Sequence, residues 1–172
     1  MIIQFDDIPP EGLRLFIDDL SWFPGELDRK GSVAVNIKLE RQENNLVFLW
    51  GDIRATLVLQ CDRCLEKFEF PLSGRFKVDF ELVKNCETVT TADEHYCSDS
   101  EMDTSLVDRP EIDIFAVLAQ QVRLSVPMKR LCSDNCRGIC PQCGANLNIE
   151  DDTCRCQVAS ASPFKALSIL KE

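Results

Sequence analysis

The chain has 172 residues, of which 45% are hydrophobic, and its formal net charge is −10. This hydrophobic content can form a buried core, which excludes a chain that is disordered throughout. The charge excludes a protein that is basic over its whole surface, as many nucleic-acid binders are, but it leaves room for a local basic face.

The first half of the chain alternates apolar and polar residues, which predicts β-strands. Within it, two short apolar runs flank Gly51, and the sequence Pro71-Leu-Ser-Gly74 reads as a turn between two further runs. Alternation with polar partners predicts an antiparallel sheet with one wet face, as a meander or an open barrel. The runs lie at residues 12–18, 32–40, 45–60 and 67–83.

Residues 85–108 are polar and acidic and have little apolar periodicity. We therefore expect a long, mobile, solvated loop there. Cys86 and Cys97 lie in this stretch without a close partner pattern, so we leave them out of any metal site. His95, the one histidine of the chain, is interpreted as an exposed loop residue and not as a ligand or a base.

Residues 111–124 carry apolar side chains at helical spacing, between Pro110 and Pro127. This predicts one main helix packed on the sheet. A second, C-terminal helix is expected after Ser162 and Pro163. The fold class is thus α+β, with a sheet domain at residues 1–130 and a cysteine-rich module with a final helix at residues 131–172.

Ten cysteines are a heavy load for a chain of this length. The first residues show neither a basic segment nor an apolar segment of the kind found in signal peptides, and no apolar run is long enough to span a membrane. We therefore expect a cytoplasmic protein, whose thiols stay reduced. In that compartment clustered cysteines indicate metal binding before disulfides.

Eight of the cysteines form four close pairs, and two such pairs supply the four thiolates of one tetrahedral zinc site. The clearest motif is Cys-Pro-Gln-Cys-Gly at residues 140–144, which with a returning pair predicts a zinc-ribbon-like hairpin, with strands at 145–148 and 153–157. We predict one or two structural zinc ions in two sites: Cys61, Cys64, Cys132 and Cys136 in the first, and Cys140, Cys143, Cys154 and Cys156 in the second.

Other arrangements of these cysteines remain open. The spacing also permits one site made of Cys132, Cys136, Cys140 and Cys143. An iron–sulfur cluster takes four cysteines as well, and disulfides would need an oxidising compartment. Cys61 and Cys64 have the spacing of a redox dithiol, which requires an exposed thiol of low pKa.

No motif in the chain indicates catalysis. The sequence lacks a phosphate-binding glycine-rich loop, a serine-nucleophile motif and a metalloprotease helix. The basic residues Lys129, Arg130 and Arg137 are candidate contacts to RNA or to a protein partner. An equally good reading is that Arg63, Arg137 and Arg155, which lie inside or beside the cysteine pairs, balance the negative charge of the four-thiolate sites.

Several stretches together resemble the YceD family, whose members are known as large ribosomal RNA subunit accumulation proteins. The resemblance is strong from Leu59 onward and weak before Leu46. The usual acidic residue before the proline of the last helix is replaced here by Ser162. The stretches are LQCDRCLEKFEFPL, DIFAVLAQQVRLSVPMKRLC, CRGICPQCGANLN, CRC and SPFKALSILK.

The resemblance implies a bacterial cytoplasmic protein without enzymatic activity that supports 23S rRNA accumulation and large-subunit assembly. Its partner would be rRNA or a basic ribosomal protein, the latter drawn by the acidic loop. The family includes members without the CPxCG segment. This agrees with the pairing of Cys61 and Cys64 with Cys132 and Cys136, because that first site can then exist without the second. Two alternatives stand beside this reading: a zinc-stabilised adaptor unrelated to ribosomes, and a thiol redox protein that uses Cys61 and Cys64.

Overall fold

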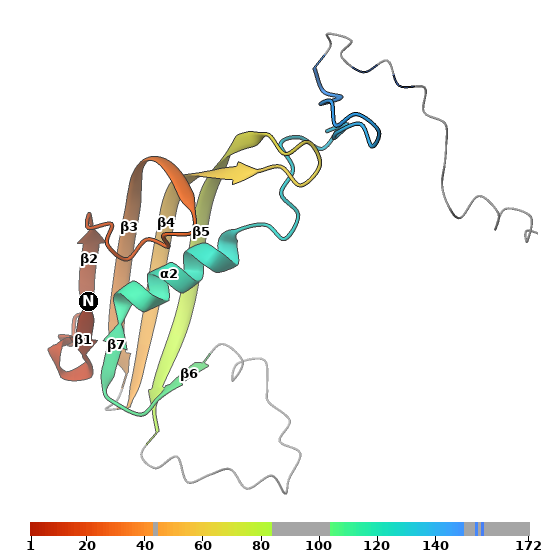
Figure 1. The fold of residues 1–172 in the computed structure, drawn as a ribbon. Coiled ribbons are helices and arrows are strands. Elements are labelled where there is room, and N and C mark those ends of the chain that lie inside the picture. The colour runs from red at the N-terminus through yellow and green to blue at the C-terminus, as the bar shows by residue number, and fades with distance from the viewer. Residues whose placement is uncertain (43–44, 84–103, 150–153, 155, 157–172) are drawn as a thin grey trace, which may run out of the picture.

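The structure, a computed structural model, describes residues 1–42, 45–83, 104–149, 154 and 156. A five-stranded sheet has the order β2-β3-β4-β5-β6, and a two-stranded sheet pairs β1 with β7. One α-helix, α2, lies across the larger sheet (Figure 1). The elements are β1 (Ile2–Gln4), the 3-10 helix η1 (Phe5–Asp7), β2 (Leu13–Ile17), β3 (Asp28–Gln42), β4 (Leu46–Gln60), β5 (Lys67–Leu82), β6 (Thr104–Val107), β7 (Glu111–Asp113) and α2 (Ile114–Ser125).

Strands β2 to β5 form an open antiparallel meander, in which each strand pairs with the next along the chain. This confirms the predicted α+β class, with a mostly antiparallel sheet and one packing helix. The exception is β6, which adds to the outer edge of β5 in parallel orientation.

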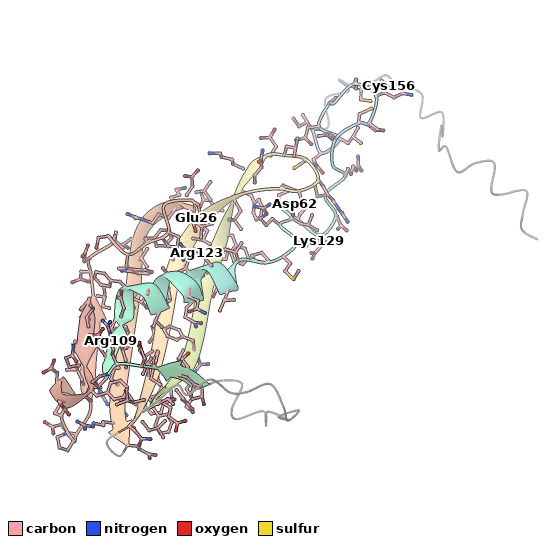
Figure 2. The ribbon with its side chains drawn as sticks, turned by 60° about the horizontal axis from the view of Figure 1, so that its bottom comes forward. Glu26, Asp62, Arg109, Arg123, Lys129 and Cys156 are labelled. Carbon is pink, nitrogen blue, oxygen red and sulfur yellow. The ribbon has the colours of Figure 1, made fainter. Side chains whose placement is uncertain are left out.

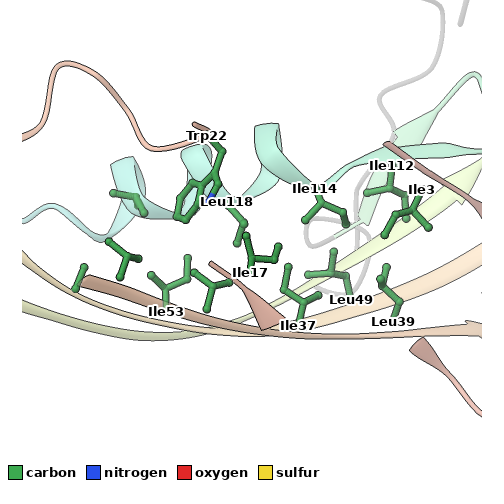
Figure 3. Close-up of a cluster of buried hydrophobic side chains, with 14 of the residues drawn as sticks. Ile3, Ile17, Trp22, Ile37, Leu39, Leu49, Ile53, Ile112, Ile114 and Leu118 are labelled. Carbon is green, nitrogen blue, oxygen red and sulfur yellow. The ribbon is translucent and has the colours of Figure 1, made fainter. Parts of the chain in front are cut away.

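The core lies between the sheet and α2 (Figure 3). Side chains from alternate positions of β3 and β4 point toward the helix, because successive residues of a strand face opposite sides of a sheet. Leu39 and Leu49 from the sheet, and Ile114 and Leu118 from the helix, are fully buried there. Trp22, from the segment between β2 and β3, closes the same layer.

The main helix begins three residues later than predicted. Residues 111–113 form β7, which pairs with β1. Asp113 then caps the helix, because its carboxylate accepts hydrogen bonds from the backbone N–H of Phe115 (3.0 Å) and Ala116 (3.4 Å). The helix ends at Ser125, since Pro127 disfavours helical geometry at Val126, which is extended.

The turn predicted at Pro71-Leu-Ser-Gly74 was wrong, because β5 runs through it as one strand. Pro71 is tolerated because β6 pairs only with residues 79–82, which leaves β5 an edge strand at the proline. Likewise β4 continues through Gly51, where the ring of Phe76 occupies the place of a side chain: a Cβ on Gly51 would lie 2.2 Å from its Cζ atom.

Two further expectations need correction, and others lie outside the described residues. We expected a loop over residues 85–108, but its last part, Thr104–Val107, forms strand β6, which pairs with β5. The expected strand at 145–148 is reduced to one bridge, between Ile139 and Asn146. The rest of the expected loop, with Cys86, His95 and Cys97, and the residues of the expected C-terminal helix lie outside the described part. No helix in the described ranges is long and apolar enough to cross a membrane.

Candidate metal centres

The first cysteine pair stands in a tight turn at the end of β4. Cys61 follows the last residue of the strand, and the backbone N–H of Leu65 donates to its carbonyl oxygen at 3.0 Å. Leu65 has a positive φ of 63°, which turns the chain back toward β5. The backbone N–H of Cys61 then donates to the carbonyl oxygen of Glu66 at 2.9 Å. Both thiols are thereby held on one side of a rigid turn.

The second pair, in the segment after α2, meets this turn. The Sγ atoms of Cys61 and Cys136 lie 3.8 Å apart, and those of Cys64 and Cys132 lie 3.7 Å apart. All four Sγ atoms fall within 4.8 Å of one another. Cys61, Cys64 and Cys136 are buried, whereas Cys132 is exposed. We call these four cysteines the proximal group.

A second group of four thiols lies farther along the chain, with Cys156 at the end remote from the sheet (Figure 2). The Sγ atoms of Cys140, Cys143, Cys154 and Cys156 also fall within 4.8 Å of one another. Those of Cys143 and Cys154 are 3.7 Å apart. We call these four the distal group.

The two Cys-x-x-Cys turns share one backbone design. In the distal turn the N–H of Gly144 donates to the carbonyl oxygen of Cys140 at 2.9 Å, and the N–H of Cys140 donates to that of Ala145 at 2.8 Å. Gly144 has a φ of 72°, at the position that Leu65 holds in the proximal turn. Such turns direct backbone N–H groups toward sulfur, which favours the thiolate.

These N–H groups set the acidity of the first thiol in each turn. Burial alone would raise the pKa of Cys61, but the N–H groups of Cys64, Cys132 and Arg63 lower it to about 6. The N–H groups of Cys143 and Gln142 lower the pKa of Cys140 to about 6.

Other thiols of the two groups are held protonated when no ion is present. The N–H of Glu66 favours the thiolate of Cys64, but burial and the neighbouring thiols raise its pKa to about 12. The thiol of Cys143 and burial raise the pKa of Cys156 to about 12. At least one thiolate in each group thus forms readily, and a bound cation would favour the ionisation of the others.

The residues inside the first motif hold the two segments of the proximal group together. The Asp62 carboxylate accepts from the backbone N–H of Arg130 at 2.8 Å and pairs with its guanidinium at 3.2 Å. The backbone N–H of Asp62 donates to the carbonyl oxygen of Arg130 at 2.8 Å. Arg63 donates to the carbonyl oxygen of Cys136 at 3.0 Å. The motif therefore binds the incoming chain as well as presenting sulfur.

Two residues that the sequence reasoning missed hold the segments around the proximal group together. The side-chain amide of Asn148 donates to Sγ of Cys136 at 3.4 Å, and its oxygen accepts from the N–H of Arg137 at 2.7 Å. Gly138, at φ 78°, lies against the backbone of Arg63, where a Cβ would be 3.1 Å from the carbonyl oxygen. In the sequence, the only indication of these two residues is that they stand in the Cys-Arg-Gly and Asn-Leu-Asn stretches beside the cysteine pairs. Their contacts become evident only in the folded structure.

The candidate contact residues fall into two kinds. Arg130 is bound to Asp62, so its side chain is engaged within the module. Lys129 and Arg137 are exposed. Lys129 lies on the segment that leads from α2 to the cysteines (Figure 2). The structure thus gathers the predicted cysteines in two fours, while their role as metal ligands and the role of the basic residues stay predictions.

Comparisons with known proteins agree with the residues that carry the resemblance. A "Large ribosomal RNA subunit accumulation protein YCED homolog 1, chloroplastic" of Zea mays is 28% identical over 94% of this chain and 64% of its own length. Uncharacterised proteins of Mycobacterium tuberculosis and Mycobacterium bovis are 29% identical over 72% of this chain and 56% of theirs. The chain thus spans less than two thirds of these relatives. No solved structure matches it.

The family described as "Large ribosomal RNA subunit accumulation protein YceD" matches residues 49–171. This range includes both four-cysteine groups, β5 and α2. Because the match covers well over half of the sequence, the chain belongs to the YceD family.

Proposed function

We propose that this chain is a non-catalytic ribosome biogenesis factor that supports accumulation of 23S rRNA and assembly of the large subunit. The observation that carries the proposal is family membership over residues 49–171, since the family is described by large ribosomal RNA subunit accumulation. The maize relative carries the same description over nearly the whole of this chain.

Each four-cysteine group fits a single tetrahedral zinc ion. Metal–sulfur bonds of about 2.3 Å in a tetrahedron place the sulfurs about 3.8 Å apart, and the measured separations are 3.7 and 3.8 Å. A disulfide would need about 2.05 Å. A multi-iron cluster would hold the thiolates on separate irons and so keep them farther apart. We therefore assign Cys61, Cys64, Cys132 and Cys136 to one ion, and Cys140, Cys143, Cys154 and Cys156 to the other.

A structural role for the metal follows from the ligand set. Four thiolates close the coordination sphere, whereas a catalytic zinc keeps a position open for water or substrate. The redox alternative rests on the low pKa of Cys61. It is weakened by the burial of that thiol, which has no exposed surface, because a reactive cysteine must be accessible.

The proposed partner is rRNA or a basic ribosomal protein, and the proposed location is the cytoplasm. Arg137 on the cysteine module (residues 131–172) and Lys129 just before it offer exposed positive charge to a partner. Arg130 would act indirectly, by holding this segment through its contact to Asp62. The acidic residues between 85 and 108 suit a basic protein. The division at residue 130 stays a proposal, and the proximal group takes two cysteines from each side of it.

Depletion of the chain in the cells that carry it tests this function. The expected result is a fall in 23S rRNA relative to 16S rRNA, and fewer large subunits in a sucrose gradient. Wild-type protein restores both, and a Cys61→Ser variant restores them poorly. An unchanged ratio of the two rRNAs after complete depletion contradicts the proposal and favours an adaptor outside ribosome assembly.

A further inference from the structure

The sheet has one face covered by α2 and one that no helix or strand of the described ranges covers (Figures 1 and 3). On the uncovered face, aligned residues from neighbouring strands form rows across the sheet. One row is Arg14, Lys38 and Trp50, from β2, β3 and β4. The next row on the same face is Phe16, Asn36, Asp52 and Arg75, which extends to β5.

A hollow of about 390 Å³ lies between these two rows. Its volume is that of a small ligand site. The row between them, which contains Ile37 and Gly51, also lines the hollow. The side chains of Leu15 and Ile37 in that row pack toward the core, so the row meets the hollow through its backbone. The walls are therefore the polar and aromatic side chains of the uncovered face.

The charge at this hollow is opposite in sign to that of the whole chain. Arg14 and Arg75 line it, and Arg54 follows in the next row. None of the three forms an ion pair with a described residue, whereas Lys38 pairs with Glu40. Asp52 is the acidic residue in the lining, and its carboxylate accepts from the Asn36 amide at 2.9 Å. On a chain of net charge −10, three guanidinium groups without an ion-pair partner among the described residues give this face a local positive charge, which suits an anionic ligand.

Aromatic rings stand beside these arginines. Phe16 is 78% exposed at the rim. Trp50 lines the hollow, and its ring centroid is 5.7 Å from that of Phe48. Lys38 and Lys77 lie over the rings of Trp50 and Phe48, at 5.6 and 4.7 Å from the centroids. Phe16 is exposed, whereas Trp50 and Phe48 are half-buried. Accessible rings interleaved with cations on an open sheet are the arrangement that stacks unpaired bases and holds the phosphates between them.

We propose that the uncovered face of the sheet binds single-stranded RNA, with one unpaired base in the hollow against Trp50 and Phe16. Arg14, Arg54 and Arg75 bind the flanking phosphates. The Asp52 carboxylate accepts an N–H of the base edge, which favours a base with an exocyclic amine. Duplex RNA keeps its bases stacked inside and offers none to such a hollow. The inference rests on the proposed function, because that function brings the chain to rRNA.

The test uses the full, zinc-loaded chain and a labelled 12-nucleotide single-stranded RNA of mixed sequence, with binding followed by fluorescence anisotropy. Release of about 0.7 counterion per phosphate contact is worth about fivefold in affinity at 0.1 M salt. The Arg14→Gln/Arg75→Gln variant should therefore bind about 25-fold more weakly and lose about 1.4 from the slope of log affinity against log salt. Trp50→Leu should weaken binding by about 5- to 150-fold with the salt slope unchanged.

The matched control is Arg109→Gln/Arg123→Gln, which removes the same charge from exposed arginines away from this face (Figure 2). It should keep affinity within about twofold, because only contacts to phosphate carry the counterion effect. A Trp22→Phe background leaves Trp50 as the one tryptophan, and its emission should be quenched by the RNA. Every variant is accepted only with unchanged metal content and melting temperature.

Equal losses in the control and the Arg14/Arg75 variant would overturn the proposal, as would absence of binding by the wild-type chain at 50 mM salt. Loss only in a Lys129→Gln/Arg137→Gln variant would place the RNA on the cysteine module and overturn it too. If the Arg14/Arg75 variant binds a basic or acidic protein less well but RNA unchanged, the face is a protein site. In each case, a fall of 23S rRNA relative to 16S rRNA when the chain is depleted from cells would still support the proposed function.

Discussion

Leu65 and Gly144 occupy the same position in two turns of the same design. Each follows the second cysteine of its pair, each has a positive φ (63° and 72°), and each donates its N–H to the carbonyl oxygen of the first cysteine. Glycine adopts this conformation without strain, but leucine does not. The proximal turn is therefore strained where the distal turn is relaxed.

Replacement of the strained leucine should stabilise the protein. Leu65→Gly removes a left-handed conformation that costs about 1–2 kcal/mol and adds about 0.4–1 kcal/mol of chain entropy to the unfolded state. Leu65 is 54% exposed, so little burial is lost. The free energy of unfolding should rise by about 0.5–1 kcal/mol in urea denaturation with zinc present. The reverse change, Gly144→Ala, should lower it, and a fall in both variants would refute the strain at Leu65.

A second glycine tests the contact between the two cysteine segments. Gly138→Ala forces a Cβ to within 3.1 Å of the Arg63 carbonyl oxygen at a φ of 78°. The expected loss is about 1–3 kcal/mol of unfolding free energy. Gly31→Ala is the control, because Gly31 has a similar φ of 75° and nothing within 4 Å. Equal losses in the two variants would show that the Arg63 contact contributes nothing.

The two cysteine groups should lose their metal separately. Cys140→Ser should remove one zinc and unfold the segment that carries the distal group while the melting of the sheet stays unchanged, because zinc binding in such modules supplies folding free energy. Cys61→Ser should also remove one zinc, but it should lower the melting temperature. That thiol is fully buried beside Phe68 and Leu131, next to the core. Elemental analysis and circular dichroism measure the two effects. Loss of both ions in either variant would show that the groups are coupled.

Metal affinity should rise steeply with pH. Zinc-bound thiols are ionised, and the pKa values of Cys64 and Cys156 near 12 mean that these two carry protons in the metal-free protein at pH 7. Neighbouring thiols, Cys136 above all, and burial raise the pKa of Cys132 as well. The N–H of Cys156 lowers the pKa of Cys154, but the thiols of Cys140 and Cys143 raise it by more. Cys61 and Cys140, near 6, are largely ionised already.

Each ion should therefore release at least about two protons at pH 7.5, so that affinity rises at least about 100-fold per pH unit. Calorimetry in two buffers of different ionisation enthalpy counts the protons directly. A metal affinity independent of pH between 6.5 and 8 would contradict thiolate ligation.

Local patterns were enough for most of the sheet and for the choice of the eight paired cysteines, although their spacing left two ways of dividing them into sites. Alternation placed β2 to β5 within a few residues, and pair spacing put the same eight cysteines together that the structure gathers. The turn predicted at Pro71 was wrong because a strand tolerates proline where it lies at the edge of a sheet. Whether β5 is an edge strand at Pro71 depends on where β6 pairs, which the local sequence does not show. The predicted helix start at Glu111 was wrong, because Glu111–Asp113 pairs with Ile2–Gln4, more than a hundred residues away, and the helix begins only at Ile114.

The sheet hollow could not have been found from the sequence. Arg14, Trp50 and Arg75 come from three strands, and only the pairing register aligns them on one face. Trp50 alone reads as an ordinary sheet residue. The contacts of Asn148 to Cys136 and of Gly138 to Arg63 depend in the same way on how two separate turns meet.

The measurement that tests the central claim most directly is the metal content of the purified native protein, by elemental mass spectrometry per mole of chain. The account predicts two zinc ions, one for each group of four thiols. A protein that is folded and metal-free, or one that holds iron in place of zinc, would contradict it.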